Sequence, residues 1–95
     1  MTAGRLGWTV FCVREASDVI ESMPTSLKND MIKFFCDFAF AGGTAIGAGD
    51  PPPGDPMDDS GIAYTMVVEG TTVFFDYVVL ADIQEFRITR MVWLG

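Results

Sequence analysis

Three charged side chains in the last two predicted strands are of types that could do chemistry. Arg87 and Arg90 lie in the segment QEFRITRMVWL, and Asp76 lies in the preceding segment TVFFDYVVL. Guanidinium groups stabilise negative charge that develops during a reaction, and a nearby carboxylate orients them or moves a proton. We therefore predict Arg87, Arg90 and Asp76 as the catalytic candidates.

A larger binding face is predicted around these candidates, because alternate residues of a strand point to the same side of a sheet. This open face consists of Thr65, Val67, Phe74, Val78, Glu85 and Thr89, with Met91 and Trp93 near its edge. Part of it is apolar, and an exposed apolar patch is unusual on a monomer unless a partner covers it. The composition of the open face favours protein binding over catalysis.

Three successive antiparallel strands must position these residues. Residues 62–69, 72–80 and 84–94 are rich in β-branched and aromatic side chains, and short breaks at 70–71 and 81–83 separate them. A second turn at Ala81-Asp82 would place Asp76 opposite Arg87, and Thr89 opposite Phe74. A simple cross-strand ion pair is therefore an alternative role for Arg87.

The spacing of the two arginines works against a shared site. Arg87 and Arg90 are three residues apart, so regular alternation sends them to opposite faces of the sheet unless a β-bulge intervenes.

The first half of the chain predicts a strand and two helices. Residues 8–13 form an apolar strand, a helix covers 14–23, and a second helix runs from Thr25-Ser26 to Gly42-Gly43, where glycine favours termination. An apolar stripe at helical spacing faces the core and consists of Leu27, Met31, Phe34, Phe35 and Phe38. Together with the three later strands, this predicts a single α+β domain over residues 1–95.

The segment 42–61 (GGTAIGAGDPPPGDPMDDSG) predicts an irregular acidic loop, because glycine and proline interrupt regular structure. Its four aspartates suggest a calcium site as an alternative to a solvated loop. Their spacing does not match the loop of a calcium-binding helix-loop-helix, so we predict no metal and no cofactor.

The amino-acid composition excludes or disfavours several classes of function. The net charge of −7 disfavours direct nucleic-acid binding, because such surfaces need clustered lysine and arginine. The absence of histidine excludes imidazole bases and ligands. Cys12 and Cys36 lie among apolar residues and are expected to be free thiols. With no apolar run long enough for a membrane span and no clear signal peptide, the chain reads as cytoplasmic.

The order of these elements and several local patterns resemble the RelE/ParE superfamily of bacterial toxins. The matching patterns are W-T-V at 8–10, E-A at 15–16, M-P at 23–24, V-F-F-D-Y-V-V at 73–79 and I-T-R-M at 88–91. The resemblance covers most of the chain except the acidic loop. It implies a strand–helix–helix–three-strand fold.

The same resemblance implies a toxin that cuts messenger RNA on the ribosome or poisons DNA gyrase and is neutralised by an antitoxin. Arg87 and Arg90 match the basic residues of the last strand in such toxins. Thr65, Met66 and Thr72 stand where the superfamily tends to carry arginines, and the chain is acidic rather than basic. These departures imply weak or absent ribosome-dependent endoribonuclease activity, and therefore a degenerate toxin or a scaffold reused for protein binding.

Two functions remain open at this point. The first is a toxin-type component bound by a partner protein. The second is a non-catalytic interaction module, a homodimer that uses the open face or an edge of its sheet, for which the apolar content of that face is the discriminating feature.

Overall fold

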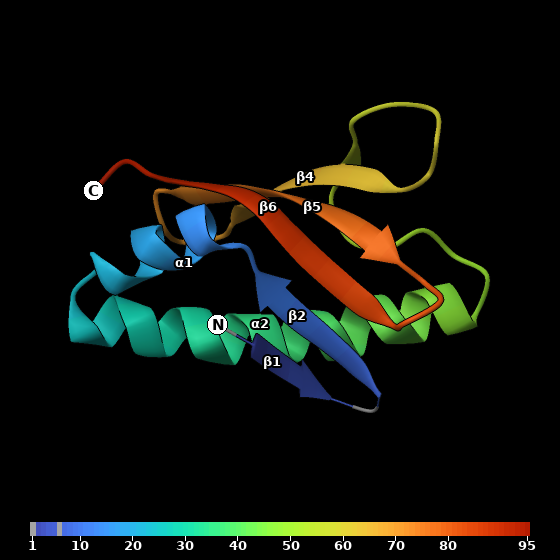
Figure 1. Ribbon diagram of the computed structural model, residues 1–95, viewed down its shortest axis with the longest axis horizontal. Coiled ribbons are helices and arrows are strands. Elements are labelled where there is room, and N and C mark those ends of the chain that lie inside the picture. The colour runs from blue at the N-terminus through green and yellow to red at the C-terminus, as the bar shows by residue number, and fades with distance from the viewer. Residues whose placement is uncertain (1, 6) are drawn as a thin grey trace.

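The computed structural model describes residues 2–5 and 7–95 and contains two helices and six strands (Figure 1). The helices are α1 (Arg14–Glu21) and α2 (Thr25–Gly47). The strands are β1 (Thr2–Arg5), β2 (Trp8–Cys12), β3 (Asp55–Pro56), β4 (Ala63–Val68), β5 (Val73–Leu80) and β6 (Glu85–Trp93). The α+β class and the meander β4–β5–β6 are as predicted. Neither described helix is long and apolar enough to cross a membrane.

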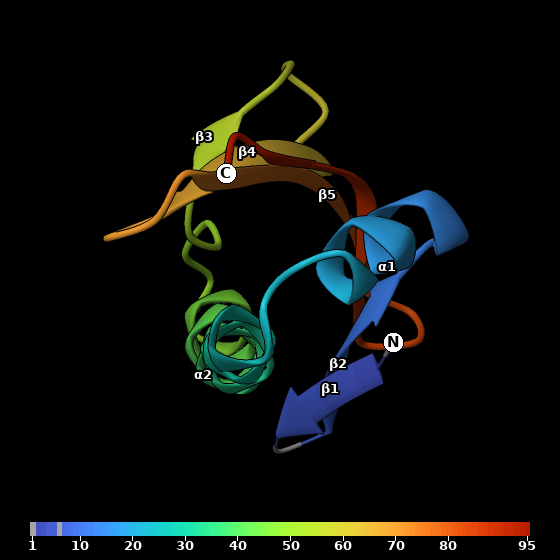
Figure 2. The same cartoon turned by 90° about the vertical axis from the view of Figure 1, so that its left-hand side faces the viewer.

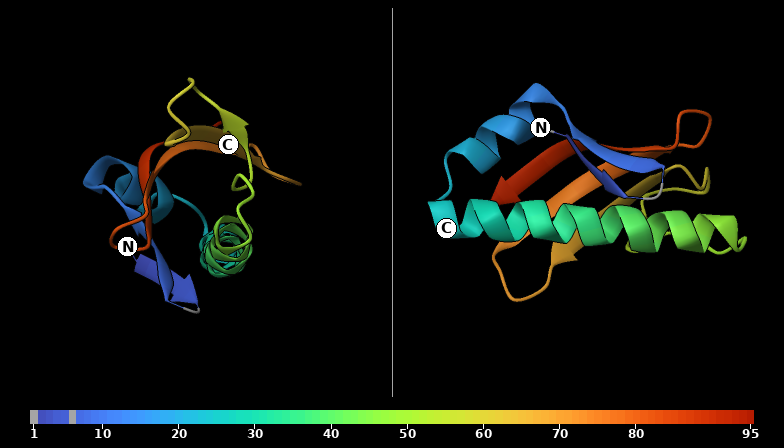
Figure 3. Two further views of the ribbon diagram at one scale, coloured as in Figure 1. Left: turned by 90° about the vertical axis from the view of Figure 1, so that its right-hand side faces the viewer. Right: turned by 90° about the horizontal axis from the view of Figure 1, so that it is seen from below.

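All six strands form one sheet in the order β1-β2-β6-β5-β4-β3. β6 lies in the middle, parallel to β2 and antiparallel to β5. The sheet is curved, and α2 runs along its concave side (Figures 2 and 3). β1 and β3 are additions to the predicted strands, and β1 makes β2 an inner strand, as its continuous apolar sequence suggests.

The faces of most strand residues and the β4–β5 register are as predicted, although the cross-strand partners of β5 and β6 are not. The β5–β6 connection is longer than expected, so Leu80 pairs with Glu85, and Arg87 lies opposite Val78 rather than Asp76. This offset is two residues, which keeps the side chains from Glu85 to Ile88 on their predicted faces because strands alternate with a period of two. Phe74 pairs with Val92, so the predicted partnership of Phe74 with Thr89 is also wrong.

A β-bulge interrupts the β5–β6 ladder between Asp76 and Tyr77. Tyr77 pairs with Ile88 and Asp76 pairs with Arg90, so Thr89 is the extra residue of β6. A bulge resets alternation beyond it. Met91 therefore faces the core and is buried, and Trp93 packs against the core as well, which corrects their predicted place at the edge of the open face.

An aromatic cluster joins α2 to the concave side of the sheet. Phe38 contacts Phe75, Tyr77 and Phe86 at ring-centroid distances of 5.8, 5.0 and 5.1 Å. Trp8 stacks on Phe86 at 4.6 Å. These rings are buried, and they confirm that the predicted stripe on α2 faces the core.

α2 continues through Gly42-Gly43 to Gly47, which corrects the predicted helix end. The pair serves close packing rather than termination. A Cβ atom on Gly42 would lie 2.6 Å from Cζ of Phe86, and one on Gly43 would lie 2.5 Å from Cδ1 of Trp8. Glycine is required here because the helix backbone approaches two large rings of the sheet.

The irregular segment is therefore shorter than the predicted 42–61 loop, and the two-residue strand β3 interrupts it by pairing with Thr65 and Tyr64. Within it, Asp58 accepts hydrogen bonds from the backbone N–H and the hydroxyl of Ser60, at 2.9 and 2.5 Å. These bonds lower the pKa of the Asp58 carboxyl below its usual value. Asp58 thus caps a local turn, and no group of three or more metal-ligating side chains is found among the described residues.

Candidate functional site

Arg87 and Arg90 lie on the same outward face of β6, because the bulge at Thr89 reverses the alternation between them. Phe86, Ile88 and Met91 point into the core, whereas the two arginines remain partly or largely exposed. From the sequence alone, a shared face for the two arginines requires a β-bulge, and the sequence does not reveal whether one is present. The bulge supplies the geometric condition that a shared arginine site needs.

Arg87 is held by a carboxylate on its own strand. Its Nη2 and Nε atoms lie 2.7 and 2.8 Å from Oε2 of Glu85, and the Glu85 side chain is only 15% exposed. The guanidinium carbon lies 5.7 Å from the ring centroid of Phe11, which stands beside Arg87 in the parallel β2–β6 pair. A charge-assisted hydrogen bond and a cation–π contact together fix this side chain.

Arg90 is freer than Arg87. Its Nη1 atom lies 3.8 Å from Oδ2 of Asp76, which is an ion pair without a good hydrogen bond. The Arg90 side chain is 66% exposed and the Asp76 side chain 16%. Asp76 thus pairs with Arg90 rather than with Arg87, and the cross-strand ion pair predicted from the sequence exists with a different arginine.

The remaining predicted residues of the open face are brought together around these two pairs. Val67 is strongly exposed, and Thr65, Phe74 and Val78 are half-buried. The Thr65 hydroxyl donates a hydrogen bond to the backbone carbonyl of Phe75 at 3.5 Å, and the Thr89 hydroxyl donates one to the carbonyl of Asp76 at 3.4 Å. Both hydroxyls therefore bind backbone atoms of the sheet.

Tyr77 does not belong to this face. It is fully buried, and its hydroxyl donates a hydrogen bond to the carbonyl oxygen of Pro53. Burial, and to a lesser degree the neighbouring Tyr64, raises the pKa of the Tyr77 phenol above its usual value. The phenol is therefore neutral at physiological pH and structural in role.

The open face can bind an anion only in competition with its own carboxylates. Arg87, Arg90, Glu85 and Asp76 sum to no net charge, and each arginine already has a partner. Phe11 is the residue of this site that sequence reasoning missed. Its place beside Arg87 depends on the parallel pairing of β2 with β6, for which no local sequence pattern gives a signal.

The two cysteines are free thiols, Cys12 buried and Cys36 half-buried. Burial raises the pKa of the Cys12 thiol to about 11. Cys12 is therefore protonated and unreactive at neutral pH, and it makes no nucleophile for the site.

No protein-family model matches the sequence, and no curated protein matches it. Among solved structures, the chain is similar to the Escherichia coli toxin RelE, in a double arginine-to-alanine mutant bound to a peptide of the antitoxin RelB. The TM-score is 0.65 over 95% of this chain and 86% of the RelE chain, at 8% sequence identity. The protein therefore has the fold of a RelE-like toxin, as its sequence pattern predicts.

Proposed function

We propose that the protein is the toxin-type component of a RelE-like toxin–antitoxin pair, acting in the cytoplasm with low intrinsic activity and bound by a partner protein. The single observation that carries this proposal is the bulge at Thr89, which places Arg87 and Arg90 on one face of a RelE-like sheet. The RelE structure holds an antitoxin peptide, which supports a protein partner here by analogy of fold.

The low activity follows from the two ion pairs. A phosphate that approaches Arg87 must displace Glu85 from hydrogen bonds of 2.7 and 2.8 Å, and one that approaches Arg90 meets the carboxylate of Asp76 nearby. If RNA is cleaved here, the arginines stabilise charge on the phosphate and one carboxylate accepts a proton. Arg90 is the more available cation, because it is more exposed and more loosely paired.

Growth of a bacterial culture on induction of the chain tests this proposal. Three proteins of equal expression are compared: the parent, an Arg87→Ala/Arg90→Ala variant, and an Asp76→Asn/Glu85→Gln variant. We expect a weak growth defect from the parent, none from the arginine variant, and a stronger defect from the carboxylate variant, whose open face gains positive charge. Normal growth with all three soluble, folded proteins would reject the toxin proposal.

A homodimeric interaction module is the second candidate function, favoured by the exposed apolar side chains of the open face. Val67 is 63% exposed and Phe11 is 37% exposed, and both lie on strands of the sheet. We expect a solution mass near twice 10.4 kDa if this face pairs with itself. Val67→Lys should then yield monomer, whereas Ile83→Lys, at a similarly exposed position in the β5–β6 connection, should leave the dimer intact. A monomeric parent protein would remove this candidate.

A further inference from the structure

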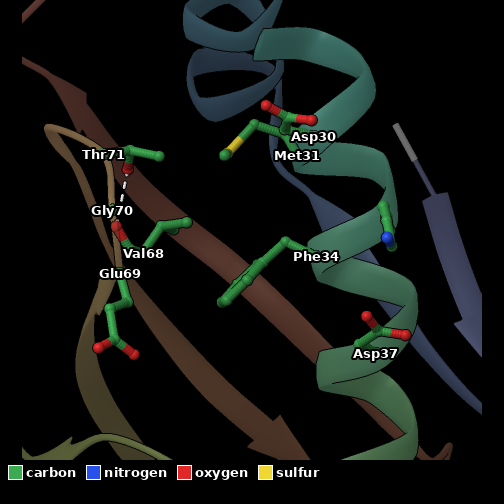
Figure 4. Close-up of a pocket in the computed structure, with 9 residues that line it drawn as sticks. Asp30, Met31, Phe34, Asp37, Val68, Glu69, Gly70 and Thr71 are labelled. Carbon is green, nitrogen blue, oxygen red and sulfur yellow. Dashed lines mark hydrogen bonds between the residues drawn. The ribbon is translucent and has the colours of Figure 1, made fainter. Parts of the chain in front are cut away.

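A groove runs between the first half of α2 and the turn that joins β4 to β5 (Figure 4). It consists of two adjoining cavities of about 320 and 540 Å³, which share Asp30, Gly70 and Thr71. The groove opens on the concave side of the sheet, whereas Arg87 and Arg90 lie on the outward face. It is a surface separate from the candidate site described above.

The floor of the groove is apolar and packs on the core of the protein. Met31 and Phe34 project from α2 toward Val68 of β4, as Figure 4 shows, and Leu27 lines one end. Phe34 is only half-buried, although its ring packs edge-on against Phe75 at 5.9 Å and stacks with Phe38 at 6.1 Å. An aromatic ring that is fixed by its neighbours and still open to solvent is the type of residue that anchors protein interfaces.

The rim of the groove is acidic. Asp30 and Asp37 stand on the helix side and Glu69 on the sheet side, all three exposed, and Lys33 is the one cation among the residues that line it. The chain as a whole carries a net charge of −7. A polyanion such as RNA is therefore repelled at this surface, and a basic ligand is attracted.

We infer that this groove binds a peptide segment of a partner protein that carries an apolar anchor flanked by lysine or arginine. The anchor packs on the open part of Phe34, over the buried Val68, and the basic side chains reach the carboxylates on both walls. The apolar contact provides most of the affinity, and the acidic rim provides specificity for a basic partner. This inference rests on the proposed function only in assuming a protein partner, and it does not require toxicity.

Two synthetic peptides test the inference by titration against the isotope-labelled chain with amide chemical shifts as the readout. One peptide has leucine and lysine at amphipathic helical spacing, and the other has glutamate in place of every lysine. Asp30→Asn/Glu69→Gln removes two charges from the groove. Asp58→Asn/Asp59→Asn removes the same charge from the exposed segment before β4, and serves as the matched control.

We expect the lysine peptide to shift the amides of Phe34, Gly70 and Thr71. The groove variant should weaken its binding about three- to tenfold, since it removes two exposed ion pairs that each contribute at most about fivefold. The control variant should weaken binding of the lysine peptide less than about twofold, because it changes only the long-range attraction between the peptide and the acidic protein. Arg87→Ala/Arg90→Ala should bind the peptide as the parent does, which keeps this result separate from the growth assay.

Four outcomes would overturn the inference. The lysine peptide fails to bind, its shifts map to the segment around Asp58, or the two charge variants weaken binding equally. Equal binding of the glutamate peptide would likewise reject a basic partner, because the apolar floor alone would then account for the affinity.

Discussion

Replacing Gly42 by alanine should destabilise the protein, although alanine is the better helix former. The new Cβ atom would lie 2.6 Å from Cζ and 3.0 Å from Cε2 of Phe86, where carbon atoms normally stay about 3.5–4.0 Å apart. Phe86 cannot yield easily, because it is fully buried between Trp8 and Phe38.

Overpacking of this kind costs about 1–3 kcal/mol, and the helix propensity of alanine offsets about 0.5–1 kcal/mol. We therefore expect a net loss of about 1–2 kcal/mol for Gly42→Ala. Gly47→Ala is the matched control, since its Cβ would meet nothing within 4 Å in the same helix. It should stabilise the protein by about 0.4–1 kcal/mol.

Thermal unfolding followed by circular dichroism separates the two variants. For a domain of this size, 1 kcal/mol corresponds to about 4–8 °C in Tm. Gly42→Ala should melt below the parent and Gly47→Ala slightly above it. Gly42→Ala melting at or above Gly47→Ala would refute the close-packing account of the glycine pair.

Three further predictions concern the sheet and the thiols. Tyr77→Phe should lower the free energy of unfolding in urea by about 1–2 kcal/mol, because the carbonyl of Pro53 loses its buried donor; an unchanged midpoint would contradict this. Deletion of Thr89 should lower the free energy of unfolding by about 1 kcal/mol or less in the same assay, because it removes only the extra residue of a bulge. A loss of several kcal/mol would show that β6 is regular at this position. At pH 8 an alkylating reagent should modify Cys36 before Cys12, because burial raises the pKa of Cys12 to about 11. Mass spectrometry counts the modified thiols. Rapid labelling of both thiols in folded protein would be inconsistent with a buried Cys12.

Most of the fold follows from local patterns in the sequence. The period-two runs around Val73 and Phe86 and the helical stripe from Leu27 to Phe38 each predict which side faces the core, and the structure confirms them. Between Glu85 and Ile88 the face assignment is correct although the partners are wrong, because the β5–β6 offset is an even number of residues, whereas beyond the bulge Met91 and Trp93 lie on the other face.

The features that could not be predicted from the sequence depend on contacts between segments that are distant along the chain. Gly42-Gly43 has the sequence of a helix end, and only the rings of Trp8 and Phe86 against it reveal a packing contact. The bulge at Thr89 and the pairing of Phe11 with Arg87 likewise have no local signature. The candidate residues could therefore be named from the sequence, whereas their ion-pair partners could not.

The central position of β6 also has a consequence for synthesis on the ribosome. β2, near the start of the chain, pairs with β6, and without β6 the β1–β2 pair has no strand joining it to β5–β4–β3. Contacts between residues this far apart in sequence form slowly, and they cannot form before β6 has left the exit tunnel. The face with Arg87 and Arg90 is thus assembled only after β6 has been translated and has paired with β2 and β5.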